Sequence, residues 1–349
     1  MTTFIQLHAL TIYPPANLNR DDVGRPKSAV FGGTPRLRIS SQSLKRAWRT
    51  SDVFQQQLEG NMGQRTQRLG EVIQRHLMDR GHDEAAAQAI AIRVAGIFGK
   101  PETGSGKNPT LIRQLAFISP EERQAAIELA DRAAAGNAID KEKAGVLRKA
   151  DTAVDIAMFG RMLADNPDYN REAAVQVAHA ITTHRVVVED DYYTAVDDLK
   201  TSAEDAGAGF VGEAGFGAGV FYLYACVDRD LLVRNLSGDR DLANAGIAAL
   251  VEAMATVSPK GKQASFASRA RASYLMAEKG ETAPRTLAAA FLKSTDGSGT
   301  QDLLNTSIHA LEAARDHFAQ AYGDAPDARV MNAAAGEGTL ADVIAFARS

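Results

Sequence analysis

The first fifty residues alternate apolar and polar positions and then change to a helical spacing. The segment TFIQLHALTI alternates up to a double proline, which predicts a strand that enters a loop. The loop, residues 14–34, is rich in glycine, proline and asparagine. RLRI follows it and predicts a short, half-exposed strand. Since Ser40 or Ser41 is a suitable N-cap, we expect one helix to run through SLKRAWRTSDVFQQQL.

Residues 64–182 have the composition and apolar spacing of helices almost throughout. The helical segments are RTQRLGEVIQRHLMDRG, EAAAQAIAIRVAGIFG, EERQAAIELADRAAAG and AAVQVAHAIT. From residue 185 the chain is β-branched and acidic, then glycine-rich, and then continues as VFYLYACVD, a strongly strand-like run. Two later helices, NAGIAALVEAMATV and QDLLNTSIHALEAARDHFAQAY, flank a loop, SPKGKQASFASRAR. This order predicts an α+β fold in which a small sheet domain carries a large helical insertion.

The net charge of −4 is distributed unevenly along the 349 residues. Residues 1–50 carry eight Lys or Arg and two Asp or Glu, a net charge of +6, so the rest of the chain sums to −10. This asymmetry favours a polyanionic partner for the N-terminal part. No apolar run reaches the ~18 residues of a membrane span, and the first residues do not resemble a signal peptide. A single cysteine, Cys226 in an apolar run, is expected to be buried and fits a reducing cytosol.

The predicted helix after Ser40 has a basic face and an apolar face. The basic face, with the spacing i, i+3, i+4 and i+7, holds Gln42, Lys45, Arg46 and Arg49. The apolar face, which we expect to be buried, holds Leu44, Ala47 and Trp48. No acidic residue lies among the cations at pairing distance along the helix, and the free N–H groups at its start suit phosphate oxygens. A polyanion is therefore favoured over the alternative, a basic face that is simply solvated.

Three other patterns suggest chemistry. The loop GSGK, residues 104–107, lacks the first glycine and the Ser or Thr of a phosphate-binding loop, because Pro101 and Asn108 occupy those positions. His179 and His184, at i and i+5, do not share a helix face, so no zinc or other metal site is expected. A cluster of carboxylates could hold Mg²⁺ for RNA hydrolysis, although charges beside a glycine-rich loop more often solvate a hairpin. The cluster consists of Glu189, Asp190, Asp191, Asp197 and Asp198.

Several motifs occur in the same order as in one known family. LNRDD, FGGTPRLRISSQSLKRAWR, DIAMFGRM, AHAITTH, YTAVDDL and AGVFYLYA resemble the backbone subunit, of the CasC family and RAMP superfamily, of the type I-E CRISPR surveillance complex, Cascade. The resemblance extends from the first strand to residue 228, and ISSQSLKRA is its most specific block. It implies an RRM-like (ferredoxin-like) palm, a helical fingers insertion and a protruding β-hairpin thumb. The corresponding divisions are residues 1–58 and 219–349 for the palm, 59–182 for the fingers and 183–218 for the thumb.

The resemblance also implies a function. Members are non-catalytic subunits, without cofactor or metal, that polymerise along a CRISPR RNA, six copies in a helical filament, and order the guide for pairing with a target DNA strand. Further partners would be the large, small, 5′-capping and 3′ repeat-processing subunits, in the prokaryotic cytoplasm and without a membrane. The alternative from the residues alone is the Mg²⁺-dependent ribonuclease that uses the carboxylates of residues 189–198.

Roles carry over residue by residue. Residues expected to contact guide phosphates are Arg20, Lys27, Ser40, Gln42, Lys45, Arg46, Arg49, Lys260 and Lys262. Candidates for packing against displaced bases at or near the thumb are Met162, Tyr193, Phe210 and Val211. Residues expected to face target DNA are Lys141, Lys143, Arg148 and Lys149.

Overall fold

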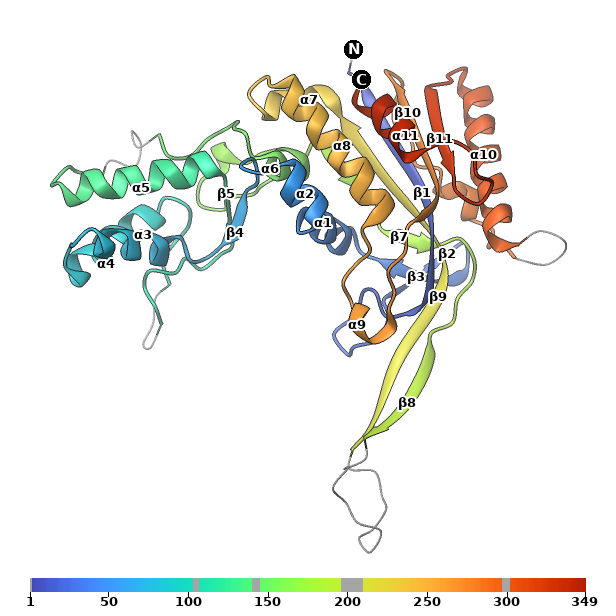
Figure 1. The fold of residues 1–349 in the computed structure, drawn as a ribbon, viewed down its shortest axis with the longest axis horizontal. Helices are drawn as coiled ribbons and strands as arrows, with labels where there is room; N and C mark the ends of the chain where they lie inside the picture. The colour runs from blue at the N-terminus through green and yellow to red at the C-terminus, as the bar shows by residue number, and fades with distance from the viewer. Residues whose placement is uncertain (1, 103–106, 140–144, 196–209, 297–301) are drawn as a thin grey trace, which may run out of the picture.

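A large antiparallel sheet and a separate helical block make up the protein (Figure 1). The computed structural model describes residues 2–102, 107–139, 145–195, 210–296 and 302–349. Within these ranges the sheet contains nine strands, ordered β11-β10-β1-β9-β7-β3-β2, and β6 and β8 also pair with β9. The strands are β1 (Phe4–Ala16), β2 (Ser28–Phe31), β3 (Thr34–Ile39), β6 (Val175–Val177), β7 (Ala180–Thr182), β8 (Glu189–Ala195), β9 (Phe210–Asp228), β10 (Ala272–Gly280) and β11 (Asp327–Asn332). The prediction of an α+β fold is confirmed.

Helices cover both faces of this sheet, because alternate residues of its central strands point to opposite sides. Ile5, Leu7 and Ala9 of β1 pack in the main core with α8, whereas Leu10 packs in a second core with α10. The first face carries α1 (Ser41–Arg49), α2 (Asp52–Gln57), α6 (Val154–Phe159), α7 (Arg229–Asn235), α8 (Arg240–Thr256) and α11 (Leu340–Arg348). The second face carries the 3₁₀ turn η2 (Ala288–Phe291) and α10 (Leu303–Tyr322). A short helix, α9 (Gln263–Phe266), lies beyond the end of α8.

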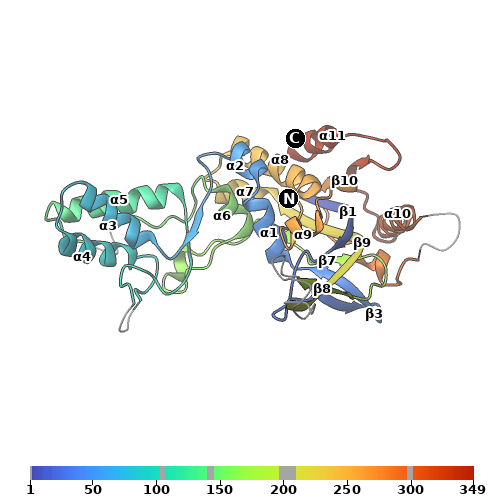
Figure 2. The ribbon, with the colours of Figure 1, turned by 60° about the horizontal axis from the view of Figure 1, so that its bottom comes forward.

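The helical block has its own hydrophobic core. It consists of α3 (Leu69–Asp79), α4 (Glu84–Ala95) and α5 (Pro120–Ala134), with a 3₁₀ turn η1 (Pro167–Tyr169) beside them. A two-stranded ribbon of β4 (Gln64–Thr66) and β5 (Ala116–Ile118) connects the block to the sheet, and Figure 2 shows the block extending to one side. Ser119 and Glu122 form a capping box at the start of α5, and Pro120 stands in its first turn.

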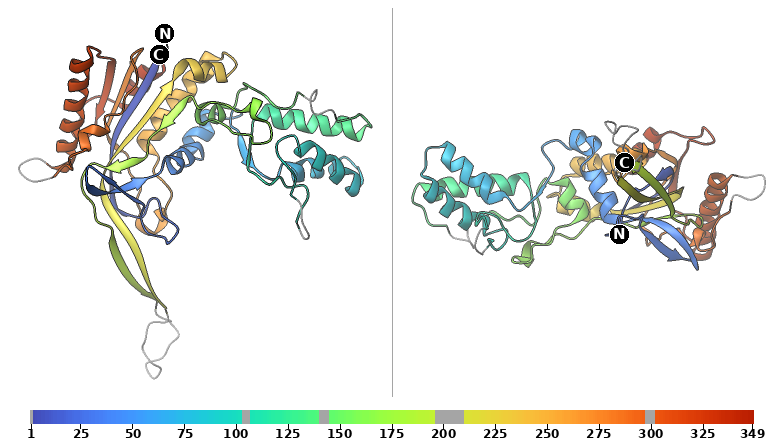
Figure 3. Two further views of the ribbon diagram at one scale, coloured as in Figure 1. Left: turned by 180° about the vertical axis from the view of Figure 1, so that it is seen from behind. Right: turned by 90° about the horizontal axis from the view of Figure 1, so that it is seen from below.

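The strands β8 and β9 form a hairpin that leaves the sheet and projects away from it (Figure 3). β9 begins in this hairpin and ends in the centre of the sheet, where it pairs with β1. Because one continuous strand spans both regions, the hairpin extends directly from the sheet. Every residue of β8 is exposed.

Three predictions about local structure were wrong. AAVQVAHAIT, predicted to be helical, contains β6 and β7, which pair with β9. Arg65 and Thr66, assigned to a helix, belong to β4, because Gln64–Thr66 pair with Ala116–Ile118. The helix predicted through residue 58 is two helices, since the Ser51 side chain caps a new helix by accepting a hydrogen bond from the Phe54 N–H.

The strand β3 was predicted correctly, but the expectation of a half-exposed strand fails at Arg36. Its side chain is 0% exposed. It donates hydrogen bonds to the backbone carbonyls of Thr182 and Phe291, at 2.9 Å each, and to the Thr34 hydroxyl at 3.0 Å. Arg36 therefore joins β3 and β7 to the layer that contains η2. The strands β2, β10 and β11 were not predicted.

Candidate nucleic-acid interface

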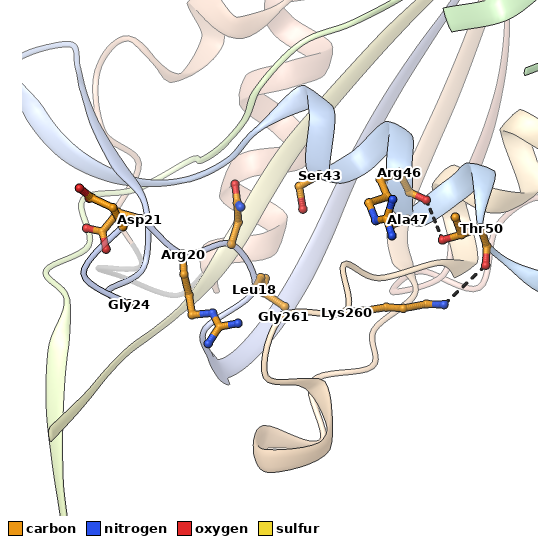
Figure 4. Close-up of a pocket in the computed structure, with 12 residues that line it drawn as sticks. Leu18, Arg20, Asp21, Gly24, Ser43, Arg46, Ala47, Thr50, Lys260 and Gly261 are labelled. Carbon is orange, nitrogen blue, oxygen red and sulfur yellow. Dashed lines mark hydrogen bonds between the residues drawn. The ribbon is translucent and has the colours of Figure 1, made fainter. Parts of the chain in front are cut away.

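A groove of about 550 Å³ runs between the N-terminal loop and α1 (Figure 4). Three separate segments form it: residues 18–24, the helix α1 with Thr50, and residues 260–261. One cation from each segment lines it, Arg20, Arg46 and Lys260. The tertiary structure thus places together three of the residues predicted to contact phosphates, although more than two hundred positions separate the first two from the third.

Backbone contacts hold the walls of this groove together. The Ser40 N–H donates to the Asn19 side chain at 2.8 Å, and the Lys27 N–H donates to the Asn19 carbonyl at 2.8 Å. Gly261 passes so close to the N-terminal loop that a Cβ there would lie 2.2 Å from the Leu18 carbonyl oxygen. The next residue, Lys262, has a φ of 47°, a left-handed conformation that costs a non-glycine residue of the order of 1 kcal/mol. Specific contacts between the segments therefore fix the shape of the groove.

The cations of the groove are available to a ligand. Arg20 and Arg46 are exposed, and no carboxylate in the described part of the chain pairs with either. Lys260 makes one long contact, 3.5 Å, from its Nζ to the Thr50 carbonyl. Asp21 lies nearby, but its Oδ1 accepts hydrogen bonds from the backbone N–H groups of residues 23 and 25. That carboxylate therefore shapes the loop, and the arginines remain unpaired.

The helix α1 has the two faces that its spacing predicts. Leu44, Ala47 and Trp48 are buried, and the Ser40 side chain caps the helix by accepting from the Ser43 N–H at 3.3 Å. Gln42 is exposed on the other face. Ser40 itself is only 7% exposed.

The two other cations of α1 are fixed by neighbours from distant segments. The Lys45 Nζ lies 5.7 Å from the centroid of the Phe159 ring, and burial lowers the pKa of Lys45. The Arg49 guanidinium lies over the Phe117 ring, and its Nη1 is 3.5 Å from the Asp155 carboxylate. The cations of α1 therefore lack an acidic partner only along the helix itself, because folding brings Asp155 to Arg49. Burial raises the pKa of Asp155 to about 6, although a hydrogen bond from the Gly63 N–H opposes the shift.

A second group of cations lies at the start of α1. His179 Nδ1 accepts a hydrogen bond from the Ser41 N–H at 3.1 Å and lies 3.3 Å from a nitrogen of Arg38. Burial, followed by the charges of Arg38 and Lys27, lowers the pKa of His179. Lys27, predicted to assist phosphate binding, is thus beside the helix N-terminus and outside the groove lining.

The hairpin carries some of the remaining candidates. Tyr193 is 45% exposed on β8. Phe210 and Val211 lie at the start of β9, opposite Ala195 and Thr194. Asn17 ties the hairpin to the N-terminal loop, because its side-chain amide donates to the carbonyls of Gly24 and Gly215, at 2.9 Å each. The groove and the base of the hairpin are therefore connected.

Other predicted residues are not among those that line the groove. Met162, which follows α6, is 79% exposed. Lys262, Arg148 and Lys149 are exposed. Lys141 and Lys143 lie outside the described residues, as do Asp197, Asp198 and most of the loop GSGK.

The carboxylates of the hairpin are dispersed in the solvent. Glu189, Asp190 and Asp191 are all exposed, and Asp190 pairs with Arg25 at 3.0 Å. No group of three or more metal-ligating side chains is placed to hold a metal ion within the described ranges. Across the same ranges, no helix combines the length and the apolar character needed to span a membrane. Cys226 is buried, as predicted, and burial raises the pKa of its thiol to about 11.

The sequence reasoning missed Ser43 and Thr50, which line the groove, and Arg65, which lies over the same ring as Arg49. Ser43 and Thr50 could have been found by continuing the helical spacing of the basic face. Arg65 could not, because its place depends on the pairing of β4 with β5.

The fold and the groove together define a mixed α/β protein in which cations from three segments line one groove, and no carboxylate of the described residues forms an ion pair with them. The model of the family described as CT1975-like protein matches residues 5–345, and the chain belongs to this family. No curated protein matches the chain.

Solved structures with the same fold include two titled as CRISPR complexes. A chain of a structure titled "CRISPR RNA-guided surveillance complex, pre-nicking" is 30% identical, with a TM-score of 0.85 over 99% of this chain and 100% of that one. A chain of a "CRISPR RNA-guided surveillance complex" is 26% identical, with a TM-score of 0.74 over 99% of each chain.

Proposed function

We propose that this protein is a CRISPR RNA-binding backbone subunit of a surveillance complex of the Cascade kind. One observation carries the proposal: Arg20, Arg46 and Lys260 converge on one groove, and none of them forms an ion pair with a carboxylate in the described part of the chain. The likeness over full length to chains of CRISPR RNA-guided surveillance complexes supports RNA as the anion that the groove receives.

The groove holds the guide through its phosphates and reads no base. Arginine and lysine side chains bind phosphate oxygens irrespective of sequence, and such contacts fix the position of a strand. Sequence recognition then belongs to base pairing between the guide and its target. By ordering the guide beforehand, the protein lowers the entropic cost of that pairing.

The remaining parts take the roles that the family resemblance implies. The sheet is the palm, related to an RNA-recognition motif, the helical block is the fingers, and the β8–β9 hairpin is the thumb. Exposed Tyr193, together with Phe210, Val211 and Met162, packs against bases displaced from the stack. Lys141, Lys143, Arg148 and Lys149 face the target DNA strand.

In this proposal the complex is of type I-E and contains six copies of the chain along one guide. Large, small, 5′-capping and 3′ repeat-processing subunits complete it, in the cytoplasm of a prokaryote. The chain itself is not an enzyme. Incubation of the purified protein with labelled RNA and Mg²⁺ tests this last point, since cleavage that Asp197→Ala or Asp198→Ala abolishes would identify a ribonuclease instead.

RNA binding is tested with variants of the groove and a matched control. The chain is expressed with a guide, and RNA that co-purifies is measured by the ratio of absorbance at 260 and 280 nm. Arg46→Ala with Lys260→Ala should weaken binding of every RNA sequence and flatten the log–log salt dependence by about 0.7 for each lost contact. Arg234→Ala is the control, because this exposed arginine does not line the groove. It lies on α7, at the end of α8 opposite to the groove. Unchanged affinity and slope in the double variant would refute the proposal.

A further inference from the structure

Two arginines from separate parts of the fold lie over one aromatic ring where the helical block joins the sheet. Arg49 comes from α1, and Arg65 comes from β4. Their guanidinium carbons lie 4.8 Å and 5.0 Å from the centroid of the Phe117 ring. The ring is 3% exposed and belongs to β5, in which Phe117 pairs directly with Arg65. The ribbon thus holds both cations against a rigid, buried platform.

The positive charge at this junction is only partly compensated. The nearby carboxylate, Asp155, is fully buried and accepts hydrogen bonds from the Gly63 N–H at 2.7 Å and the Ile156 N–H at 3.1 Å. It contacts Arg49 at 3.5 Å from the interior side. Arg65 is exposed, and no carboxylate in the described structure forms an ion pair with it. Burial lowers the pKa of Arg65, and the charges of Arg49 and Arg46 lower it further, while the charge of Asp155 opposes the shift.

Such an arrangement suits a phosphate group. A guanidinium that stacks on a ring keeps the N–H donors at its edge free, and these form paired hydrogen bonds with phosphate oxygens. A bound anion would also relieve the repulsion between the two arginines, which the charge of the buried Asp155 offsets only in part. Arg49 is one helical turn beyond Arg46, so this position continues the line of the groove along α1.

We propose that Arg65 and Arg49 form a second phosphate-binding site, which receives the backbone of the same single RNA strand as it continues from the groove toward the helical block. The inference rests on the proposed function and deepens it. The RNA strand then contacts both α1, through Arg46, and the β4–β5 ribbon at the base of the helical block, through Arg65. The ribbon that carries the helical block takes part in holding the guide itself, in addition to any role of the block toward a target strand.

The test is the binding of fluorescent guide RNA to the full chain, measured by anisotropy over a range of salt concentrations. Arg65→Ala should weaken binding about tenfold at ~0.1 M salt and reduce the salt slope by about 0.7. Arg65→Lys keeps the charge but loses the planar fork, so it should keep the slope and recover only part of the affinity. Arg93→Ala is the matched control, since Arg93 is exposed on α4 of the same block, and it should bind as the wild type does.

Comparison with Arg46→Ala distinguishes a failure of the second phosphate-binding site from a failure of the proposed function. If Arg46→Ala weakens binding and Arg65→Ala does not, the second site is refuted while the proposed function stands. If neither variant changes binding, the proposed function fails and the second site fails with it. Preloaded complexes are also tested with a complementary DNA strand. Normal guide loading with impaired capture of that strand by Arg65→Ala would assign Arg65 to the target and overturn the inference.

Discussion

The buried Arg36, in the basic N-terminal segment, tests how much the hydrogen bonds of an interior guanidinium stabilise this fold. We predict that Arg36→Ala lowers the free energy of unfolding by about 4 kcal/mol. The side chain is 0% exposed and donates to two buried backbone carbonyls, those of Thr182 and Phe291. Each carbonyl that loses its donor costs about 1–3 kcal/mol, and the cavity left by the side chain adds to this.

A second substitution separates the hydrogen bonds from the packing. Arg36→Met nearly preserves the side-chain volume but still leaves both carbonyls without that donor, so we expect a loss of about 3 kcal/mol. Arg38→Ala is the control on the same strand, and because Arg38 is only half-buried its loss should stay below about 1 kcal/mol.

The assay is equilibrium unfolding in urea, followed by circular dichroism, with the guide RNA absent. If Arg36→Met is as stable as the wild type, the reasoning is refuted. In that case the cost of removing an unpaired guanidinium from water would equal the value of its hydrogen bonds. Burial lowers the pKa of Arg36, and no carboxylate in the described structure forms an ion pair with it, so no ion pair offsets this cost.

Three further predictions concern the groove, the junction and the core. Gly261→Ala should reduce RNA affinity severalfold, because the new Cβ would lie 2.2 Å from the Leu18 carbonyl oxygen and displace a wall of the groove. Gly99→Ala is the control, because the Cβ at that position would make only ordinary van der Waals contacts. Equal RNA binding by the two variants would contradict this prediction. Burial raises the pKa of Asp155 from 3.8, its ordinary value and the one expected in the unfolded chain, to about 6 in the folded state. Because the folded state then favours the protonated carboxyl, its ionisation should lower the free energy of unfolding by up to about 3 kcal/mol as the pH rises from ~4 to ~6. Urea unfolding of Asp155→Asn at several pH values should lack this decrease, and an unchanged profile would show that Asp155 does not cause it. The Cys226 thiol, with its pKa raised to about 11, should react with iodoacetamide at pH 8 only as urea unfolds the protein, and rapid labelling of the native chain would contradict its burial.

The basic helix shows how far local sequence can specify a site. A serine cap, predicted at Ser40 or Ser41 and found at Ser40, and the burial of Leu44, Ala47 and Trp48 follow from helical geometry and from side-chain polarity, so both could be predicted from the sequence. The charge environment of Arg49 could not be predicted in this way. Its partners, Asp155 and the Phe117 ring, come from segments that only folding brings to α1.

The short strands show the opposite limit. β6 and β7 have three residues each, and their local composition favours a helix. They are strands because each can pair with β9, whose own extended conformation is stabilised by β1. The free energy gained by pairing and packing in a large sheet exceeds the small intrinsic preference of these residues for a helix.

The sequence by itself determined the α+β class, the strand character of VFYLYACVD, the main helices and the two faces of α1, because these depend on periodicity and on neighbours a few residues away. Only the tertiary structure decided which cations share a site. It placed Arg20, Arg46 and Lys260 around one groove, Arg65 beside Arg49, and Arg36 in the interior. The physical reason is that burial and electrostatic environment are set by contacts between distant segments, which a one-dimensional pattern of charges does not contain.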